Sequence, residues 1–237
     1  MFQIATGLAL ALEHNDNYGI DVKNHIERGQ GGHISRYVDT IFSKINKLTT
    51  DNSYNIFKET LYEFKPISYS DKIILDGYFQ SEKYFAKYKK QIIDMFSINY
   101  INESTFPICT IHIRTGDYIA SPPFNVVTPT YFMNAITYIQ SLNPDVYFKI
   151  ITDNSVLAKT YIPKDLTYED ISSSDEIADL SSIAISDYVI MSNSSFSWWG
   201  SYLGKDKLTI VPDIWFNLPD IKMIDIYRDD MIKISTK

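Results

Sequence analysis

The second half of the chain alternates short apolar runs with stretches in which apolar residues recur at helical spacing. The apolar runs predict strands at 108–114, 146–152, 187–192 and 208–212. The stretches with helical spacing predict helices at 128–142, 155–161, 176–185 and 196–203. Thr128 followed by Pro129 is typical of a helix start, because threonine caps free N–H groups and proline suits the first turn. Strands that alternate with helices predict an α/β fold with a parallel sheet.

The first half of the chain has a less regular pattern. It predicts a buried helix at 2–12, a short strand at 18–22, a helix at 34–47, and a strand ending at Gly77 that precedes a helix from about Ser81 to 96. Residues 49–72 are mixed and polar and predict no element. The glycine-rich loop RGQGGH at 28–33 lacks the lysine pattern of a P-loop and the strand of a dinucleotide fingerprint, so a plain connection is favoured over a phosphate cradle.

Length and charge limit the classes of protein. The 237 residues fit one large α/β domain or two lobes of about 100 to 130 residues. A formal net charge of −7 argues against non-specific nucleic-acid binding, which requires clustered basic residues. Any phosphate site is therefore expected to be local.

The cysteine content and the apolar segments predict a location. Cys109 is the single cysteine and lies in an apolar run, which predicts a buried structural thiol and a reducing, cytoplasmic compartment. No apolar stretch reaches the ~18 to 20 residues of a membrane span. The apolar N-terminus lacks a basic region, so we interpret it as a helix rather than a signal peptide. Peripheral membrane association stays open.

Unusual polar residues follow three of the predicted strands. In strand 108–114, His112 and Arg114 point to the side opposite Ile111 and Ile113, and the strand stops before Gly116. Strand 146–152 leads into Asp153, and strand 187–192 leads into the sequence SNSS and a helix. Ligands of open α/β sheets bind beyond the carboxyl ends of the strands, so these residues are candidates for one site.

The junction before the last of these helices has the features of an anion site. Ser194 and Ser195 can cap the helix, whose first N–H groups and dipole favour a negative charge. Arg114 from a neighbouring strand end would then help to clamp a diphosphate. The alternative is that the serines are only caps and that Arg114 only pairs with Asp117 or Asp153.

Other candidates carry a structural alternative as well. A lone histidine such as His112 is more often a structural group than a ligand. Trp198 and Trp199 occupy consecutive helical positions, so at least one is expected in the core, with sugar stacking as the alternative. Asp117 is a candidate base, although bonding to its own turn is favoured. The sequence has no D-x-D spacing and no histidine or cysteine cluster, so a diphosphate would be neutralised without a metal.

Three segments resemble the motifs of the α-1,2-fucosyltransferase family, a glycosyltransferase family 11-like group. They are HIRTGDY at 112–118, DGYFQSEKYF at 76–85 and SNSSFSWWGSYL at 192–203. The first residues, MFQIATGLALA, resemble the end of that family's first motif, and the resemblance covers almost the whole chain.

The resemblance implies a GT-B-like fold of two Rossmann-like lobes with parallel sheets. Residues 1–104 would form a mainly acceptor-side lobe, truncated at its N-terminus, and residues 105–237 a donor-binding lobe. The implied reaction is inverting, metal-independent transfer of fucose from GDP-fucose to a sugar hydroxyl, in particular the 2-OH of a galactoside. The expected partners are a nucleotide sugar and a glycan acceptor, with no cofactor, no metal and no nucleic acid.

The resemblance also implies roles for individual residues. Arg114 matches the arginine that holds the donor β-phosphate, His112 matches a histidine that contacts the nucleoside, and Asp179 matches the acidic residue that recognises guanine. Ser194 and Ser195 match the serines of the phosphate loop. The predicted catalytic residues are Arg114 and Asp117, and the remaining predicted donor-binding residues are Thr115, Asp153, Asn193 and Phe196.

The sequence departs from the family pattern at two places. Thr115 occupies the position of a second arginine, and the chain begins inside the first motif, so we expect a strand and a G-N-Q sequence to be encoded upstream of Met1. An in-frame stop directly before Met1 would remove that explanation. Two alternatives follow: the same fold with another nucleotide sugar, or a binding protein that no longer catalyses transfer.

Overall fold

The chain divides into two compact units. The computed structural model describes residues 1–22, 34–51, 53–60, 62–98, 104–204, 207–219, 221 and 223–237. The first unit comprises Met1–Ile98 and Met223–Arg228, and the second comprises Asn99–Lys222 and Asp229–Lys237. The short segment 223–228 thus belongs to the first unit, whereas a single boundary after residue 104 would assign it to the second.

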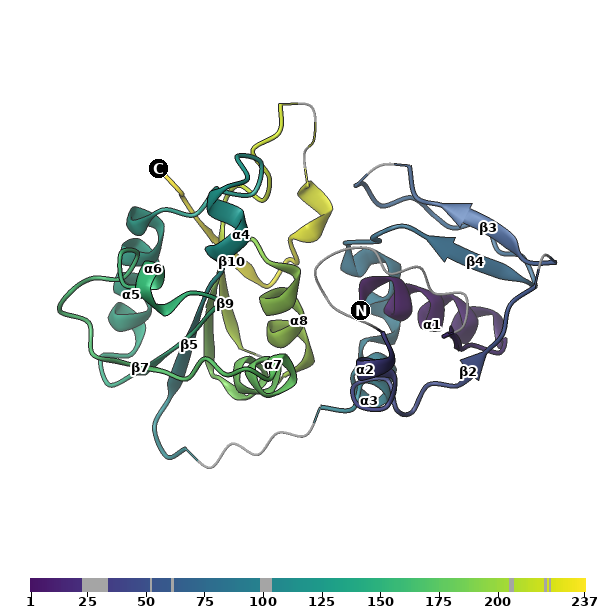
Figure 1. Cartoon of the computed structure of the whole chain (residues 1–237), viewed down its shortest axis with the longest axis horizontal. Coiled ribbons are helices and arrows are strands. Elements are labelled where there is room, and N and C mark those ends of the chain that lie inside the picture. Colours follow the sequence, from purple (N-terminus) through teal and green to yellow (C-terminus); the bar gives the residue numbers. More distant parts are fainter. Residues whose placement is uncertain are drawn as a thin grey trace. The chain divides into compact units, whose positions relative to one another are not determined.

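The second unit is built on a six-stranded sheet in which every neighbouring pair is parallel (Figure 1). In spatial order the strands are β10 (Met231–Ile234), β9 (Leu208–Pro212), β8 (Tyr188–Met191), β5 (Ile108–Ile113), β6 (Tyr147–Thr152) and β7 (Tyr168–Asp170). The predicted parallel α/β sheet is confirmed, and β5 lies between β6 and β8, so its end is flanked by two others.

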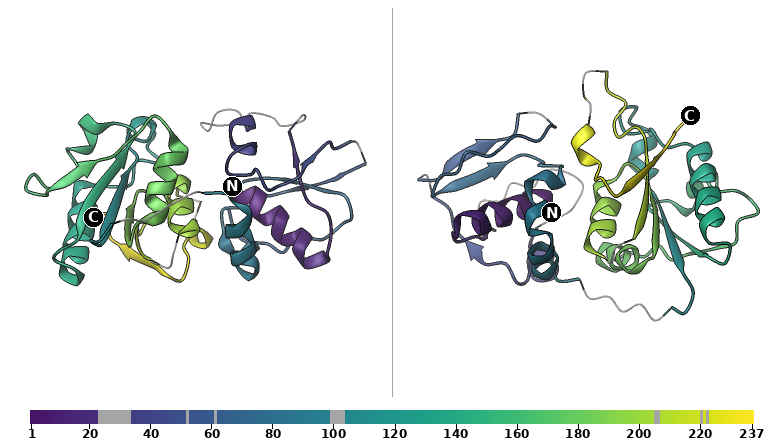
Figure 2. Two further views of the ribbon diagram at one scale, coloured as in Figure 1. Left: turned by 90° about the horizontal axis from the view of Figure 1, so that it is seen from below. Right: turned by 180° about the vertical axis from the view of Figure 1, so that it is seen from behind.

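Helices cover both faces of this sheet. They are α4 (Gly116–Ile119), α5 (Pro129–Leu142), α6 (Ser155–Ala158), α7 (Glu176–Ile185) and α8 (Ser195–Leu203). Figure 1 shows α5 and α6 on one side of the strands and α7 and α8 on the other, and Figure 2 shows the same layers from two further directions. The predicted cap of α5 is confirmed, because Thr128 Oγ1 accepts the N–H of Tyr131 at 3.2 Å.

The alternation of β5 decides which side chains reach which helix layer. Ile111 and Ile113 are fully buried in the core that the strands form with α5. On the opposite face, Thr110 Oγ1 bonds to Ser186 Oγ beyond α7, and His112 bonds to Ser197 of α8. The predicted division of this strand into an apolar and a polar side is therefore confirmed.

Four elements of the second unit differ from the prediction. Strands β7 and β10 were not predicted, since β7 has only three residues and both lie at the edges of the sheet. Helix α6 ends at Ala158 rather than near residue 161. The chain does not simply break at Gly116, because residues 116–119 form the single turn α4.

The first unit contains two separate parallel strand pairs in its described part. They are β1 (Ile20–Asp21) with β2 (Lys47–Leu48) and β3 (Asn55–Lys58) with β4 (Ile73–Asp76). The helices are α1 (Phe2–His14), α2 (Ser35–Val38) and α3 (Lys89–Met95), with 3-10 turns η1 (Glu82–Tyr84) and η2 (Ala86–Tyr88). A second Rossmann-like sheet, and with it the two-lobed GT-B fold, stays a prediction.

The predicted helix at 34–47 is mostly wrong. Only α2 is helical, and turns follow it up to β2. Val38, Ile41, Phe42 and Ile45 are all buried, so their spacing did mark a buried side. Burial alone did not fix a helical backbone. Strand β3 lies in the polar stretch 49–72, where no element was predicted, and the RGQGGH loop lies outside the described residues.

The segment 223–228 is fixed in the first unit by a carboxylate. Asp225, in the 3-10 turn η3 (Ile224–Ile226), accepts the N–H of Phe64 at 2.8 Å and pairs with the ammonium group of Lys83. Ile226 beside it is fully buried. These long-range contacts explain why a sequence pattern could not assign the segment to its unit.

Candidate active site

The carboxyl ends of β5, β6 and β8 bring the predicted residues together. Ile113 is paired with Thr152, and His112 is paired with Met191, so the residues that follow these positions meet at one edge of the sheet. Arg114 leaves β5 there, beside Asp153 from β6 and Ser192 from β8. The convergence predicted from the strand ends is thus present in the structure.

Two carboxylates hold the guanidinium group of Arg114. Nε and Nη2 of Arg114 lie 2.9 and 2.8 Å from Oδ1 of Asp117, and Nε lies 3.1 Å from Oδ2 of Asp153. The side chain of Arg114 is 30% exposed, so the group is oriented but still accessible from solvent. The ion pairs that the sequence analysis gave as an alternative are therefore present, and both carboxylates take part.

Asp153 also fixes the turn that follows β5. Its Oδ1 accepts the N–H of Thr115 at 2.9 Å, and its Oδ2 accepts the N–H of Gly116 at 3.0 Å. A Cβ atom at Gly116 would lie 2.7 Å from Oδ2 of Asp153, which is too close for any larger residue without a shift. A larger residue at this position would therefore displace the carboxylate that holds the turn.

Two residues that the sequence analysis did not single out link Arg114 to the start of α8. The hydroxyl of Ser192 accepts the backbone N–H of Arg114 and donates to the carbonyl oxygen of His112, both at 3.0 Å. The ring of Tyr118 lies 5.7 Å from Cζ of Arg114, and the nearby Ser194 acts against the rise in the phenol pKa that burial of Tyr118 causes. Tyr118 belongs to the HIRTGDY motif and lies four positions after Arg114, which was the available signal.

The start of α8 is capped largely by its own residues. Ser194 Oγ accepts the N–H of Phe196 at 3.3 Å, and the N–H of Ser194 donates to the carbonyl oxygen of Ser192 at 2.7 Å. The sequence analysis expected the first N–H groups of this helix to be available to an anion, and for Ser194 and Phe196 this is wrong. The N–H of the exposed Ser195 has no hydrogen-bond partner among the described residues.

His112 is a buried, neutral imidazole. Its side chain lies against α8, with Nδ1 2.9 Å from Ser197 Oγ and its ring 5.4 Å from that of Phe196. Burial, assisted by the positive charge of Arg114 and opposed by Asp153, lowers the pKa of His112 to about 4. At pH 7 the ring can donate one hydrogen bond and accept another, but it carries no charge.

Asn193 and Asp179 complete the predicted set. Asn193 is 1% exposed, and its amide donates to the carbonyl oxygens of Phe124 and Trp215 at 3.0 and 2.9 Å, so it braces the β8–α8 junction. Asp179, in the first turn of α7, accepts the N–H of Ser173 at 3.0 Å, and burial raises the pKa of its carboxyl group. Their contacts with a donor stay predictions.

The tryptophans and the cysteine are part of the core. Trp198 and Trp199 are both buried in α8, which agrees with the expectation of at least one core tryptophan and leaves neither ring exposed for sugar stacking. Cys109 is fully buried in β5, and burial raises the pKa of its thiol well above the usual value. The predicted structural thiol is confirmed.

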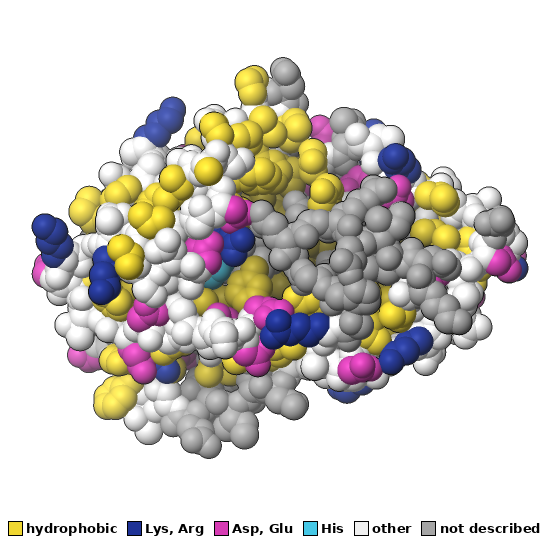
Figure 3. Space-filling model, viewed as in Figure 1, with side chains coloured by type: hydrophobic (Ala, Val, Ile, Leu, Met, Phe, Trp, Pro, Cys, Tyr) yellow, Lys and Arg dark blue, Asp and Glu magenta, His cyan; other side chains and the backbone are white. Residues whose placement is uncertain are grey.

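Charges of both signs are mixed on the surface. Figure 3 shows acidic and basic side chains interspersed on one face rather than gathered into a patch of one sign. In the described ranges, no group of three or more His, Cys, Asp or Glu side chains is placed to hold a metal ion. Within the same residues, none of the helices has both the length and the apolar content needed to span a bilayer. Metal independence stays a prediction.

The fold and the polar cluster define an α/β protein whose candidate site lies at the carboxyl edge of a parallel sheet. The chain belongs to glycosyl transferase family 11, whose sequence profile matches residues 35–235, and it is a glycosyltransferase. The resemblance inferred from the three motifs is thereby confirmed, and the alternative of a non-catalytic binding protein loses its support.

Three curated relatives carry related names. The chain is 24% identical to an alpha-1,2-colitosyltransferase of Escherichia coli over 283 aligned positions, which cover 99% of this chain and 94% of the relative. It is 26% identical to the O-antigen biosynthesis glycosyltransferase WbnK of Escherichia coli, over 60% of this chain and 55% of the relative. It is 29% identical to a galactoside 2-alpha-L-fucosyltransferase of Caenorhabditis elegans, over 58% and 44% respectively. No solved structure matches the chain.

Proposed function

We propose that this glycosyltransferase transfers fucose from GDP-fucose, with inversion at the anomeric carbon, to the 2-OH of a galactoside in a glycan. The family and the name of the Caenorhabditis elegans relative support this substrate pair. The observation that carries the proposal is the position of Arg114 at the carboxyl edge of β5, linked through Ser192 to Ser194 at the start of α8. A leaving diphosphate would lie between these two elements.

The chemistry requires stabilisation of negative charge on the leaving group. As the bond from the sugar to the β-phosphate breaks, charge grows on the phosphate oxygens. Arg114 supplies a fixed positive charge, and the N–H of Ser195 with the dipole of α8 supplies a second favourable field. Because Asp117 and Asp153 already orient the guanidinium group, little reorganisation is needed when the donor binds. No metal or cofactor enters this scheme.

The same geometry gives Asp117 a positioning role. One of its oxygens is engaged by two nitrogen atoms of Arg114, so it is better placed to aim the guanidinium group than to accept a proton from an acceptor hydroxyl. We assign it to positioning, and the general base of the reaction is left without a residue. Asp153 has the same function and in addition holds Thr115 and Gly116.

The remaining donor contacts follow from the family resemblance. We propose that neutral His112, with Phe196 beside it, contacts the nucleoside, that Asp179 recognises guanine, and that Ser194 and Ser195 form the phosphate loop. Asn193 and Thr115 hold the backbone around them. In this scheme the second unit binds the donor and the first unit binds the acceptor. A single, buried cysteine supports a cytoplasmic location.

Incubation with labelled GDP-fucose and a panel of β-galactosides tests the proposal. We expect a fucosylated product whose new bond joins the anomeric carbon of α-fucose to O2 of galactose, as determined by NMR of the product. Calorimetry should show binding of GDP-fucose and GDP but not of UDP sugars. Failure to bind GDP, or binding of UDP sugars instead, would contradict the donor assignment.

A second donor is favoured by one comparison. The relative that aligns with 99% of this chain is named a colitosyltransferase. Colitose lacks one of the ring hydroxyl groups of fucose. A site built to hydrogen-bond that hydroxyl would reject the colitosyl donor by a large factor, whereas a site that excludes it would prefer colitose. Competition between the two donors, linked to the same nucleotide, separates the two functions by their kcat/KM values.

A further inference from the structure

The carboxyl edge of the β3–β4 pair in the first unit joins a carboxylate to a tight turn. Lys58 is paired with Asp76, so Glu59 and Gly77 follow side by side, and the N–H of Glu59 donates to the carbonyl oxygen of Asp76 at 2.8 Å. Ligands of parallel sheets bind beyond this edge. The feature lies wholly within one unit.

The carboxylate of Glu59 is built into this turn. Its Oε2 accepts the backbone N–H groups of Tyr78 and Phe79 at 2.6 and 2.9 Å. A Cβ atom at Gly77 would lie 2.4 Å from Cβ of Glu59, so the close approach requires glycine. Oε1 of Glu59 has no hydrogen-bond partner within the described part of the chain, which leaves an acceptor beside the turn.

The turn is strained at a buried aromatic residue. Phe79 has φ of 51°, in the left-handed region that bulky residues rarely adopt, and it is fully buried. Such strain persists where surrounding contacts enforce it and is common at ligand sites. Here the buried ring of Phe79 and the two bonds to Glu59 enforce it, and the neighbouring Tyr78 is directed outward.

Tyr78 presents its ring to solvent next to a second tyrosine. Its exposed fraction is 64%, although its backbone N–H is held by the carboxylate of Glu59. The ring of Tyr62 lies 6.1 Å from it, with an angle of 22° between the planes. The pair offers an apolar face and the phenol hydroxyl of Tyr78 at the same edge as Glu59.

We propose that Glu59, Tyr62 and Tyr78 form a sugar-binding site. The apolar C–H face of a pyranose would stack on a tyrosine ring, and Oε1 of Glu59 would accept hydrogen bonds from the hydroxyl groups of that sugar. That this sugar is the acceptor glycan rests on the proposed function.

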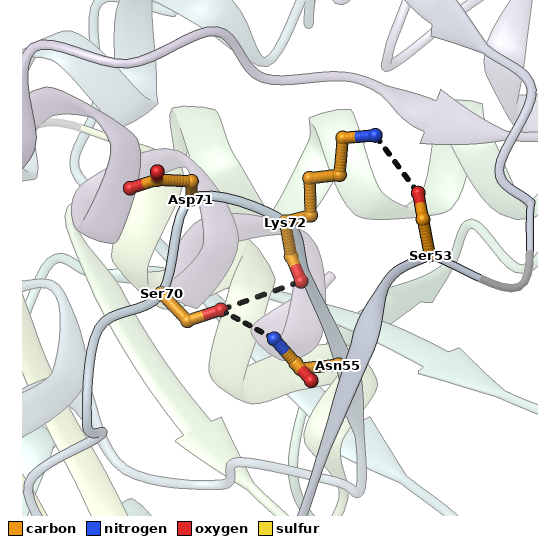
Figure 4. A pocket seen from close by; sticks show the side chains of 5 residues that line it. All are labelled: Ser53, Asn55, Ser70, Asp71 and Lys72. Atoms are coloured by element: carbon orange, nitrogen blue, oxygen red, sulfur yellow. Dashed lines mark hydrogen bonds between the residues drawn. The ribbon is translucent and has the colours of Figure 1, made fainter.

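A hollow at the opposite end of the same strands has a different character. This pocket has a volume of about 510 Å³ and is lined by Ser53, Asn55, Ser70, Asp71 and Lys72. Figure 4 shows how these five side chains lie. The polar groups of the pocket largely satisfy one another, since Lys72 Nζ donates to Ser53 Oγ at 2.8 Å and Asn55 Nδ2 donates to Ser70 Oγ at 2.9 Å. The pocket lies at the amino ends of β3 and β4. Substitutions of its residues therefore serve as controls for substitutions at the proposed sugar site.

Direct binding tests the site without donor or turnover. Saturation-transfer NMR with lactose and methyl β-galactoside should show contact with the wild-type protein. Tyr78→Ala should weaken binding at least about tenfold, because the stacking face is lost. Tyr78→Phe should change binding less than about threefold, because the ring remains. Glu59→Gln keeps one acceptor oxygen but loses the charge, so its sugar affinity should lie between those of Tyr78→Ala and Tyr78→Phe. The control Lys72→Ala should bind the sugar as tightly as the wild type does.

Kinetics distinguishes this inference from the proposed function. In Tyr78→Ala we expect a higher KM for the acceptor, with unchanged binding of GDP-fucose and unchanged thermal unfolding. Equal sugar affinity of wild type and Tyr78→Ala would overturn the site even if fucose is transferred. Absence of GDP-fucose binding by a wild type that still binds sugar through Tyr78 would overturn the proposed function and keep the site. Weakened binding in Lys72→Ala but not in Tyr78→Ala would place the sugar in the hollow instead.

Discussion

Nε of Arg114, at the end of β5, lies 3.1 Å from Oδ2 of Asp153, at the end of the neighbouring strand β6. The same carboxylate accepts the N–H groups of Thr115 and Gly116. Asp153 thus binds both the backbone of the turn and the guanidinium group of Arg114, and Asp117 in α4 binds the same guanidinium group. The orientation of the guanidinium group therefore depends on both carboxylates.

Replacement of Arg114 tests its part in charge stabilisation. Arg114→Ala should lower kcat by about 10² to 10³, because removal of one preorganised donor to a developing oxyanion costs about 3 to 4 kcal/mol. Arg114→Lys keeps the charge but loses the planar fork, so an intermediate rate is expected. Steady-state kinetics with GDP-fucose and thermal unfolding are the measurements. Near-normal turnover in Arg114→Ala would refute the assignment.

Replacement of Asp153 should affect stability and activity together. Asp153→Ala leaves the N–H groups of Thr115 and Gly116 without their acceptor, which should lower the free energy of unfolding by about 1 to 3 kcal/mol. It should also reduce kcat, because the guanidinium group of Arg114 loses one of the two carboxylates that orient it. Urea denaturation and kinetics measure the two effects. Asp117→Ala serves as the control, since it removes a partner of Arg114 without removing the acceptor of the turn.

Gly116 offers a test that leaves all charges in place. In Gly116→Ala the new methyl group would meet Asp153 Oδ2 at 2.7 Å, so the carboxylate must move. We expect a loss of kcat comparable to that of Asp153→Ala, with normal secondary structure by circular dichroism. Wild-type kinetics in Gly116→Ala would show that the position of Asp153 is not important for turnover.

Burial of His112 predicts a specific dependence of stability on pH. The pKa of His112 is lowered from 6.5 to about 4, so below pH 6.5 the unfolded chain binds a proton that the folded protein does not. The stabilisation is complete above pH 6.5 and is lost as the pH falls through about 4, with a total of up to about 3 kcal/mol.

Urea denaturation between pH 7 and 4 measures this effect. The wild-type free energy of unfolding should fall with pH more steeply than that of His112→Gln, whose side chain does not titrate. Parallel curves for the two proteins would show that His112 is not responsible.

The metal requirement can be tested directly. Because the scheme neutralises the diphosphate with Arg114 and backbone N–H groups, activity should persist after dialysis against EDTA. Readdition of Mg²⁺ or Mn²⁺ should raise kcat by less than about twofold. A catalytic metal stabilises the transition state by several kcal/mol, so its removal would lower kcat far more. Activity that vanishes in EDTA and returns with a metal would require a different scheme.

The sequence was most informative where strands and helices alternate. The ends of β5, β6, β8 and β9 were predicted closely, because each is a buried apolar run bounded by polar residues. The contact of Arg114 with Asp117 and Asp153 was given only as an alternative to a diphosphate site, and both ion pairs are present. Ser192 and Tyr118 were not predicted, because their contacts depend on side-chain directions that spacing along the chain does not give.

The first unit was predicted less well. Apolar residues between 38 and 45 are buried as expected, but all of them after Val38 lie outside a helix, because burial does not distinguish a helix from a compact loop. Strand β3 is largely exposed, so it lacks the apolar pattern of a core strand. The carboxylate of Glu59 and the conformation of Phe79 gave no signal, since both depend on the pairing of β3 with β4.

The hold of Asp225 on the first unit has a practical consequence for dissection of this protein. The chain leaves that unit after Ile98, re-enters it at Met223 and leaves again after Arg228 to form the edge strand β10. No single cut therefore yields two complete halves. A fragment that stops before Met223 would lack residues 223–228 of the first unit and strand β10 of the second unit. Separate expression of either unit therefore requires that its part of residues 223–237 be fused to it or co-expressed with it.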